Sequence, residues 1–127
     1  MKKSRILIVD DHALLRHGLK SIIQYQKDME VVGEAENGQA AVQLAKTLLP
    51  DLVVMDLVMP VMDGVEATRL IKSGSHQAKI LILTTFGTSA DISRALDAGA
   101  TGAIMKDTPD DKLLSAIRRA IKGEAVL

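Results

Sequence analysis

The chain has 127 residues, 47% of them hydrophobic, which is enough for one domain with a substantial core. Its net charge is zero and it has one Tyr, one Phe and no Trp, so it lacks the basic excess and the aromatic platforms of a dedicated nucleic-acid surface. It has no cysteine, which excludes disulfides and thiolate chemistry. Since no apolar run approaches the roughly 20 residues of a membrane span, we expect a cytoplasmic protein without a membrane partner.

Five short apolar runs, each followed by a helical pattern, make up the chain. The runs predict strands at Arg5–Val9, Glu30–Ala35, Leu52–Asp56, Ile80–Leu83 and Ala103–Met105. Helical spacing of apolar residues follows at Leu15, Leu19, Ile22 and Ile23; at Val42, Ala45 and Leu49; at Ala67, Leu70 and Ile71; at Ile92, Ala95 and Leu96; and at Leu113, Leu114, Ile117 and Ile121. Strands that alternate with helices predict a parallel sheet covered on both faces, with the more polar second strand at an edge.

Turn and capping residues mark the ends of these helices. Asn37 is expected to be the N-cap of the second helix, and Pro50 follows its end. Gly99 is expected to close the fourth helix. Thr108 is predicted to be the N-cap of the last helix, with Pro109 in its first position.

Polar residues stand where four of the five strands end. In a parallel sheet the carboxyl ends of the strands on either side of a topological switch point form the functional crevice, so these residues are predicted to converge. Each of these residues also has a simpler interpretation when it is considered alone. Asp10 or Asp11 could cap the following helix, Lys106 could be a surface lysine, and Thr84 fits the end of any strand. Together they favour a functional site composed of Asp10, Asp11, Asp56, Thr84 and Lys106.

Three neighbouring carboxylates repel one another and need a countercharge. An all-oxygen site suits Mg²⁺, which favours one or two carboxylates together with a phosphate. Lys106 and Thr84 add an ammonium and a hydroxyl donor, and a carboxylate such as that of Asp56 can act as the nucleophile in phosphoryl transfer. Other candidates are interpreted as ordinary solvated or packing residues: His12, His17, His76, Met55, Met59, Met62, Arg118 and Arg119.

These motifs resemble the receiver domain of bacterial two-component response regulators. The resemblance rests on Asp10-Asp11, the run Asp56-Leu-Val-Met-Pro-Val-Met-Asp-Gly64, Thr84-Thr85 and Lys106. The sequences of three further segments are similar to those of NarL/FixJ-type receivers: Val9-Asp-Asp-His-Ala-Leu-Leu-Arg16, Val31-Val-Gly-Glu-Ala35 and Ala95-Leu-Asp-Ala-Gly-Ala100. It implies a flavodoxin-like three-layer α/β sandwich, with a five-stranded parallel sheet of order 2-1-3-4-5 and five helices, formed by residues 1–127 as one domain.

The resemblance also implies a role for each site residue. Asp56 would accept a phosphoryl group from a phosphohistidine of a sensor histidine kinase. Mg²⁺ would be bound by Asp11, Asp56 and the backbone carbonyl of Val58, with Asp10 acting through water. Thr84 and Lys106 would each bond a phosphoryl oxygen. Beyond self-phosphorylation from a phosphodonor and autodephosphorylation, no enzyme activity is expected.

Two positions depart from the usual pattern of the family. Ala103 occupies the position three before the lysine, where many receivers have an aromatic residue that moves with the threonine. Asp107 follows the lysine where many receivers have a proline with a cis bond, so a cis bond is not expected here.

NarL/FixJ-type proteins normally carry a C-terminal helix-turn-helix domain, which this chain does not contain. The resemblance therefore implies transcription regulation, DNA binding only through that further domain, and a possible homodimer on phosphorylation. One alternative is a stand-alone receiver that acts by protein–protein interaction. Another is a phosphatase of the haloacid-dehalogenase type, but such enzymes need a second Asp at position 58, where this chain has Val58.

Overall fold

The computed structural model describes residues 2–74, 78–85 and 89–126. Strands and helices alternate strictly along the chain. In order they are β1 (Ser4–Val9), α1 (Ala13–Gln24), β2 (Met29–Ala35), α2 (Gly38–Leu48), β3 (Leu52–Met55), α3 (Gly64–Lys72), β4 (Lys79–Thr84), α4 (Ser89–Asp97), β5 (Gly102–Met105) and α5 (Asp110–Ile121).

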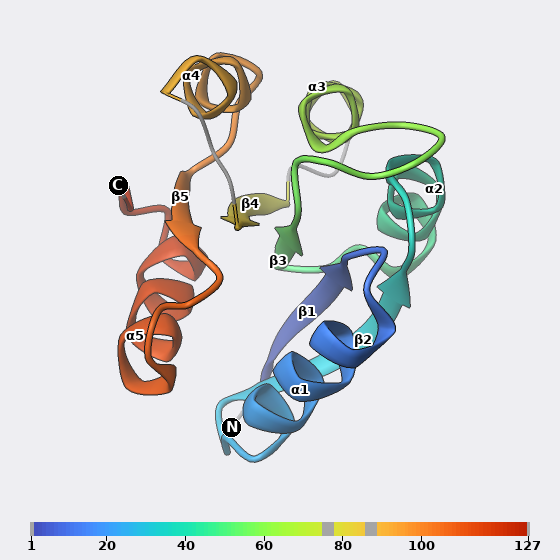
Figure 1. Cartoon of the computed structure of the whole chain (residues 1–127). Helices are drawn as coiled ribbons and strands as arrows, with labels where there is room; N and C mark the ends of the chain where they lie inside the picture. Colours follow the sequence, from blue (N-terminus) through green and yellow to red (C-terminus); the bar gives the residue numbers. More distant parts are fainter. Residues whose placement is uncertain (1, 75–77, 86–88, 127) are drawn as a thin grey trace.

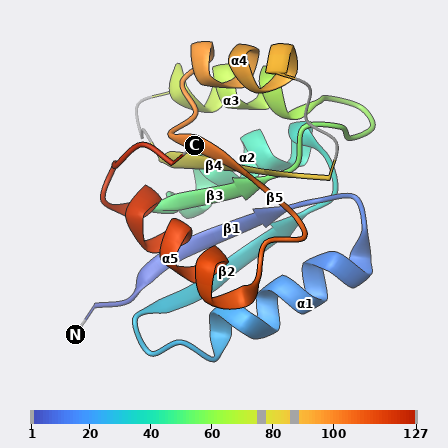
Figure 2. The same ribbon diagram turned by 60° about the vertical axis from the view of Figure 1, so that its left-hand side comes forward.

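The five strands form one parallel sheet in the order β2-β1-β3-β4-β5. Helices α1 and α5 cover one face of this sheet, and α2, α3 and α4 cover the other (Figures 1 and 2). The structure therefore confirms the predicted three-layer sandwich and its strand order. The more polar β2 lies at an edge, as its composition predicted.

The two hydrophobic cores are built from alternate residues of the same strands. In β1, Leu7 and Val9 face the core under α2, α3 and α4, while Ile6 and Ile8 face the core under α1 and α5. Strands β3 and β4 alternate in the same way. Successive side chains of a strand point to opposite faces, so a strand buried on both faces must be apolar at every position. This explains the continuous apolar run that ends at Asp56.

The register of the sheet brings the strand ends to one level. Val9 of β1 pairs with Met55 of β3, so that Asp10 and Asp56 are the next residues of neighbouring strands. The backbone N–H of Asp56 donates to the carbonyl of Val9 at 3.0 Å, which continues the ladder by one step. On the other side, the N–H of Lys106 donates to the carbonyl of Thr84 at 2.9 Å.

The start of α5 differs from the prediction, whereas the end of α4 agrees with it. Helix α5 begins at Asp110 with Pro109 as its N-cap, so the prediction that Thr108 is the N-cap was wrong. The Thr108 hydroxyl instead donates to the carbonyl of Met105 at 2.6 Å, closing the turn before the helix. Helix α4 ends at Asp97, and Gly99 follows in the left-handed region with φ of 118°.

Other predictions about single residues were confirmed or lie outside the described segments. The side chain of Asn37 caps α2 by accepting from the N–H of Ala40 at 2.8 Å. Met55 and Met59 are buried in the core, as packing residues should be. His76 lies outside the described residues.

Among the residues that the structure describes, no helix has both the length and the apolar character required to cross a bilayer.

Candidate functional site

An ammonium group between two carboxylates forms the centre of the site. Lys106, which follows β5, places Nζ 2.6 Å from Oδ2 of Asp10 and 2.9 Å from Oδ2 of Asp56. The side chains of all three residues are at most 9% exposed. Residues separated by up to 96 positions in the chain thus meet at one edge of the sheet, as the strand-end argument predicted. Buried charges of this kind are tolerated only when they are paired.

The Asp56 carboxylate is held at both oxygens. Its Oδ1 accepts the backbone N–H of Leu57 at 2.7 Å, and its Oδ2 accepts the Lys106 ammonium. The start of α3 packs directly against the backbone of the same residue: a Cβ added to Gly64 would lie only 2.3 Å from the Asp56 carbonyl oxygen. Only glycine fits at this close approach. The first residue of helix α3 therefore constrains the backbone position of Asp56.

A hollow of about 260 Å³ opens over this centre, large enough to hold a small hydrated anion or ion pair. Its walls are formed by polar groups from several strand ends together with the loop after β3. They are Asp11, His12, Asp56, Val58, Thr84, Thr85 and Lys106. Five of the six site residues predicted from the sequence line this hollow: Asp11, Asp56, Val58, Thr84 and Lys106. The sixth, Asp10, does not line it but contacts the Lys106 ammonium.

The ionic contacts shift the pKa values of the groups that make them. Burial alone would raise the pKa of Asp10, but hydrogen bonds from Lys106 and from the backbone of His12 outweigh it and lower that pKa below its ordinary value. Burial would likewise lower the pKa of Lys106, but its hydrogen bonds with Asp10 and Asp56 raise that pKa above its ordinary value. At neutral pH the contact is therefore an ion pair between charged groups.

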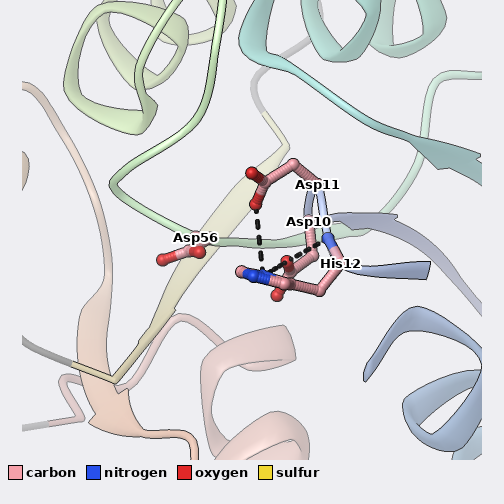
Figure 3. A group of neighbouring side chains, drawn as sticks. All are labelled: Asp10, Asp11, His12 and Asp56. Atoms are coloured by element: carbon pink, nitrogen blue, oxygen red, sulfur yellow. Dashed lines mark hydrogen bonds and ion pairs between the residues drawn. The ribbon is translucent and has the colours of Figure 1, made fainter. Parts of the chain in front are cut away.

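His12 belongs to the same cluster. Its Nδ1 lies 3.2 Å from Oδ1 of Asp10 and 3.4 Å from Oδ1 of Asp11, so the ring lies between the two carboxylates (Figure 3). The side chain is 66% exposed, as expected for a solvated residue. The spacing of histidines along the sequence did not indicate a site here. Its position directly after the two aspartates was the one available signal.

Arg16 is a second residue that the sequence did not single out. It is buried in α1, and its Nη1 donates to the backbone carbonyl of Asp10 at 2.6 Å. Its Nε faces Glu34 of β2 at 3.4 Å. Arg16 thus links the loop after β1 to strand β2. Arg118 lies on a solvated face as predicted, with its side chain 40% exposed, and forms a two-pronged ion pair with Asp28 at 2.9 and 3.0 Å.

The donor set of the cluster is suited to a divalent cation. Asp10, Asp11, His12 and Asp56 each offer a ligand atom, and these atoms all lie within 4.8 Å of one another. Carboxylate oxygens are hard ligands of the kind that Mg²⁺ prefers. A cation would also offset the repulsion between three neighbouring carboxylates, only two of which contact the Lys106 ammonium among the described residues. The residues present therefore fit a magnesium ion.

The two departures from the usual receiver pattern are also visible. Ala103 is buried in β5, without a side chain large enough to change between an inward and an outward position. In the described part of the chain no peptide bond is cis, and the bond between Lys106 and Asp107 is accordingly trans.

Comparisons with known proteins agree with this geometry. The family model for the response regulator receiver domain matches residues 6–118. The response regulator protein VraR of Staphylococcus aureus (strain Mu3 / ATCC 700698) is 45% identical over 122 residues, which cover 96% of this chain and 58% of that protein. The chain thus spans little more than half the length of this curated relative.

Two solved structures are similar over nearly the whole chain. The signal receiver domain of the response regulator NarL from Mycobacterium tuberculosis has a TM-score of 0.93 and 32% identity, covering 98% of this chain and all of the other. A LuxR-family two-component response regulator from Aurantimonas sp. SI85-9A1 has a TM-score of 0.93 and 36% identity, covering 99% of this chain and 90% of the other.

Proposed function

Because the chain belongs to the response regulator receiver domains, and among them to the NarL/FixJ (LuxR-family) type, we propose that its site transfers a phosphoryl group onto Asp56. The observation that carries this proposal is the position of Asp56, which is buried, held by Lys106 and open to the hollow that Thr84 lines. In the transfer, the P–N bond of a phosphohistidine breaks as a P–O bond forms to a carboxylate oxygen of Asp56. The histidine of the donor leaves as free imidazole.

The surrounding groups would stabilise the charge that develops on the phosphoryl oxygens. Lys106 already donates a hydrogen bond to the Asp56 carboxylate and can donate one to a phosphoryl oxygen as well. Thr84 lines the same hollow and offers a hydroxyl. Mg²⁺ would be held by Asp11, Asp56 and the Val58 carbonyl, with Asp10 acting through water, and when bound it neutralises phosphate charge.

The output follows from the change in charge at the strand ends. Phosphorylation adds negative charge and acceptor oxygens beside Thr84 and Lys106. Movement of Thr84 toward the phosphoryl group would rearrange the face formed by α4, β5 and α5 and so bias a two-state element. With Ala103 in β5, this movement has to proceed without an aromatic partner.

Receiver domains interact with histidine kinases, and we propose such a sensor kinase as the phosphodonor of this cytoplasmic domain. In a longer protein of the NarL/FixJ type, the output would be transcription regulation through a helix-turn-helix domain that binds DNA, with dimerisation on phosphorylation. The similarity to VraR and to the LuxR-family regulator supports this extension. Autodephosphorylation would return the domain to its resting state.

Intact-mass spectrometry tests the proposal. The chain is incubated with acetyl phosphate and Mg²⁺, and the wild type should gain the mass of one phosphoryl group. Asp56→Asn should gain none, because an amide is not a nucleophile of comparable strength. Asp111→Asn, which removes an exposed carboxylate at the start of α5, is the matched control and should behave as the wild type.

Two results would overturn the proposal. One is an equal gain of mass by the Asp56→Asn variant. The other is steady release of phosphate from a generic phosphomonoester with Mg²⁺, which would indicate a phosphatase rather than a phospho-acceptor.

A further inference from the structure

The imidazole ring of His12 lies beside the carboxylates of the proposed metal site. The function proposed above gives this ring no role. His12 precedes the first residue of α1, and its backbone N–H donates to Oδ1 of Asp10 at 2.9 Å. This bond fixes the backbone of His12, and so the position of its Cα, relative to the Asp10 carboxylate. The ring then reaches back to both aspartates, with Nδ1 facing one oxygen of each (Figure 3).

The distances match those between ligands of a single metal ion. Two ligand atoms that each lie about 2.1 Å from one ion are about 3.0 Å apart at an octahedral angle and about 3.4 Å apart at a tetrahedral angle. Nδ1 of His12 lies 3.2 Å from Oδ1 of Asp10 and 3.4 Å from Oδ1 of Asp11. The nitrogen and the two oxygens therefore need little rearrangement to bind one ion.

The three atoms lie close together at a solvent-accessible position. Lys106 occupies Oδ2 of Asp10, while Oδ1 accepts the backbone N–H of His12 and faces its Nδ1. The Asp11 side chain is 32% exposed and the His12 side chain 66% exposed, which gives a hydrated ion access from solvent. His12 and Asp11 also line the hollow above Asp56 together.

An imidazole ligand changes which ion such a site prefers. Mg²⁺ favours oxygen ligands and keeps its waters, whereas Zn²⁺, Co²⁺ and Ni²⁺ are well suited to imidazole nitrogen. We propose that His12 is a metal ligand that makes this site bind transition-metal ions, Zn²⁺ in particular, through Nδ1 together with Asp10 and Asp11. The proposal rests on the metal site of the proposed function and adds a specificity-determining residue to it.

Calorimetric titration of the 127-residue chain with Zn²⁺, and separately with Mg²⁺, tests this assignment. Replacing His12 by glutamine should weaken Zn²⁺ binding at least about tenfold, since losing a metal ligand costs no less than losing one of its supporting partners. The Mg²⁺ affinity of the same variant should change less than about threefold, because its oxygen ligands remain. His17→Gln, an exposed histidine of α1, is the matched control and should change neither affinity.

A second variant and a spectrum identify the ligands. Asp11→Asn should weaken the binding of both ions, since it removes an oxygen that the two share. With Co²⁺ as a visible probe, the absorption bands of the wild type should shift in His12→Gln and stay unchanged in His17→Gln. Far-ultraviolet circular dichroism confirms that each variant is folded.

The outcomes separate this inference from the proposed function. Equal Zn²⁺ affinity and unchanged Co²⁺ spectra in wild type and His12→Gln would overturn the role of His12, while leaving Mg²⁺ binding and phosphorylation intact. A wild type that binds Zn²⁺ through His12 but neither binds Mg²⁺ nor gains a phosphoryl group would support the inference and overturn the proposed function.

Discussion

At the scale of single residues, Lys106 supplies the positive charge that compensates two buried carboxylates of the site. Its ammonium group pairs with Asp10 and Asp56 at once, and the side chains of all three are nearly excluded from solvent. Removing one partner from a buried ionic contact leaves the other charges uncompensated, which typically costs about 3–5 kcal/mol. Lys106 therefore stabilises the folded chain before any phosphoryl group is present.

The replacement Lys106→Gln should lower the free energy of unfolding at neutral pH, and the loss should depend on pH. Asp10 has a lowered pKa when folded, so its contribution is present above its ordinary pKa of about 3.9 and lost as pH falls through the folded value. Lys106 has a raised pKa, so its contribution is present below about 10.4 and lost as pH rises through the folded value.

Urea denaturation across the pH range measures this difference. The wild type should exceed Lys106→Gln by a nearly constant amount between about pH 5 and pH 10, and the difference should shrink on either side. Lys112→Gln, an exposed lysine of α5, is the control and should stay within about 0.5 kcal/mol of the wild type. A difference that does not change below pH 4 would contradict the assigned ion pair.

At the scale of elements, two helices hold the strand ends in place from opposite faces of the sheet. Helix α3 begins at Gly64, whose N–H donates to the carbonyl of Leu57 at 2.8 Å while its Cα packs against Asp56. Helix α1 contributes Arg16, which binds the Asp10 carbonyl. Both contacts are with backbone atoms and not with the carboxylate oxygens, so both position the two aspartates.

Two glycine-to-alanine replacements should have opposite effects on stability. Gly64→Ala places a methyl group 2.3 Å from the Asp56 carbonyl oxygen, so the backbone must shift and stability should fall by more than about 2 kcal/mol. Gly18→Ala lies within α1, where an added Cβ meets nothing within 4 Å, and should raise stability by about 0.5–1 kcal/mol.

The unfolding free energy of both variants in urea checks this pair. Because Gly64 touches Asp56, its alanine variant should also lose phosphorylation, whereas Gly18→Ala should keep it. Equal stability of the two variants would show that α3 does not constrain the position of Asp56.

At the scale of the whole molecule, the function depends on a fold that gathers strand ends. Continuous apolar runs predicted the buried strands β1, β3 and β4 because a strand covered on both faces has no polar side. The alternation of strands and helices then placed Asp10, Asp56 and Lys106 at the same edge of a parallel sheet. The strand order itself came from the family resemblance, because periodicity does not determine which strands are neighbours.

Loop conformations account for most of what could not be predicted. Thr108 and Pro109 both fit the start of a helix, and only the bond from Thr108 to the Met105 carbonyl excludes the threonine as the cap. Val61 adopts a φ of 70°, which a β-branched residue rarely does and which no propensity would suggest. The approach of His12 to Asp10 likewise depends on how the loop turns after β1.

The central claim is that Asp56, Lys106, Thr84 and the acidic pair act together on one phosphoryl group. Beryllium fluoride with Mg²⁺ mimics that group without covalent transfer, and ¹⁹F NMR of the chain observes its bound fluorides directly. We predict resonances of bound fluoride that require Mg²⁺, disappear in Asp56→Asn and Asp11→Asn, and shift in Thr84→Val and Lys106→Gln. Unchanged resonances in the Asp56→Asn variant, or in both the threonine and the lysine variants, would contradict the account.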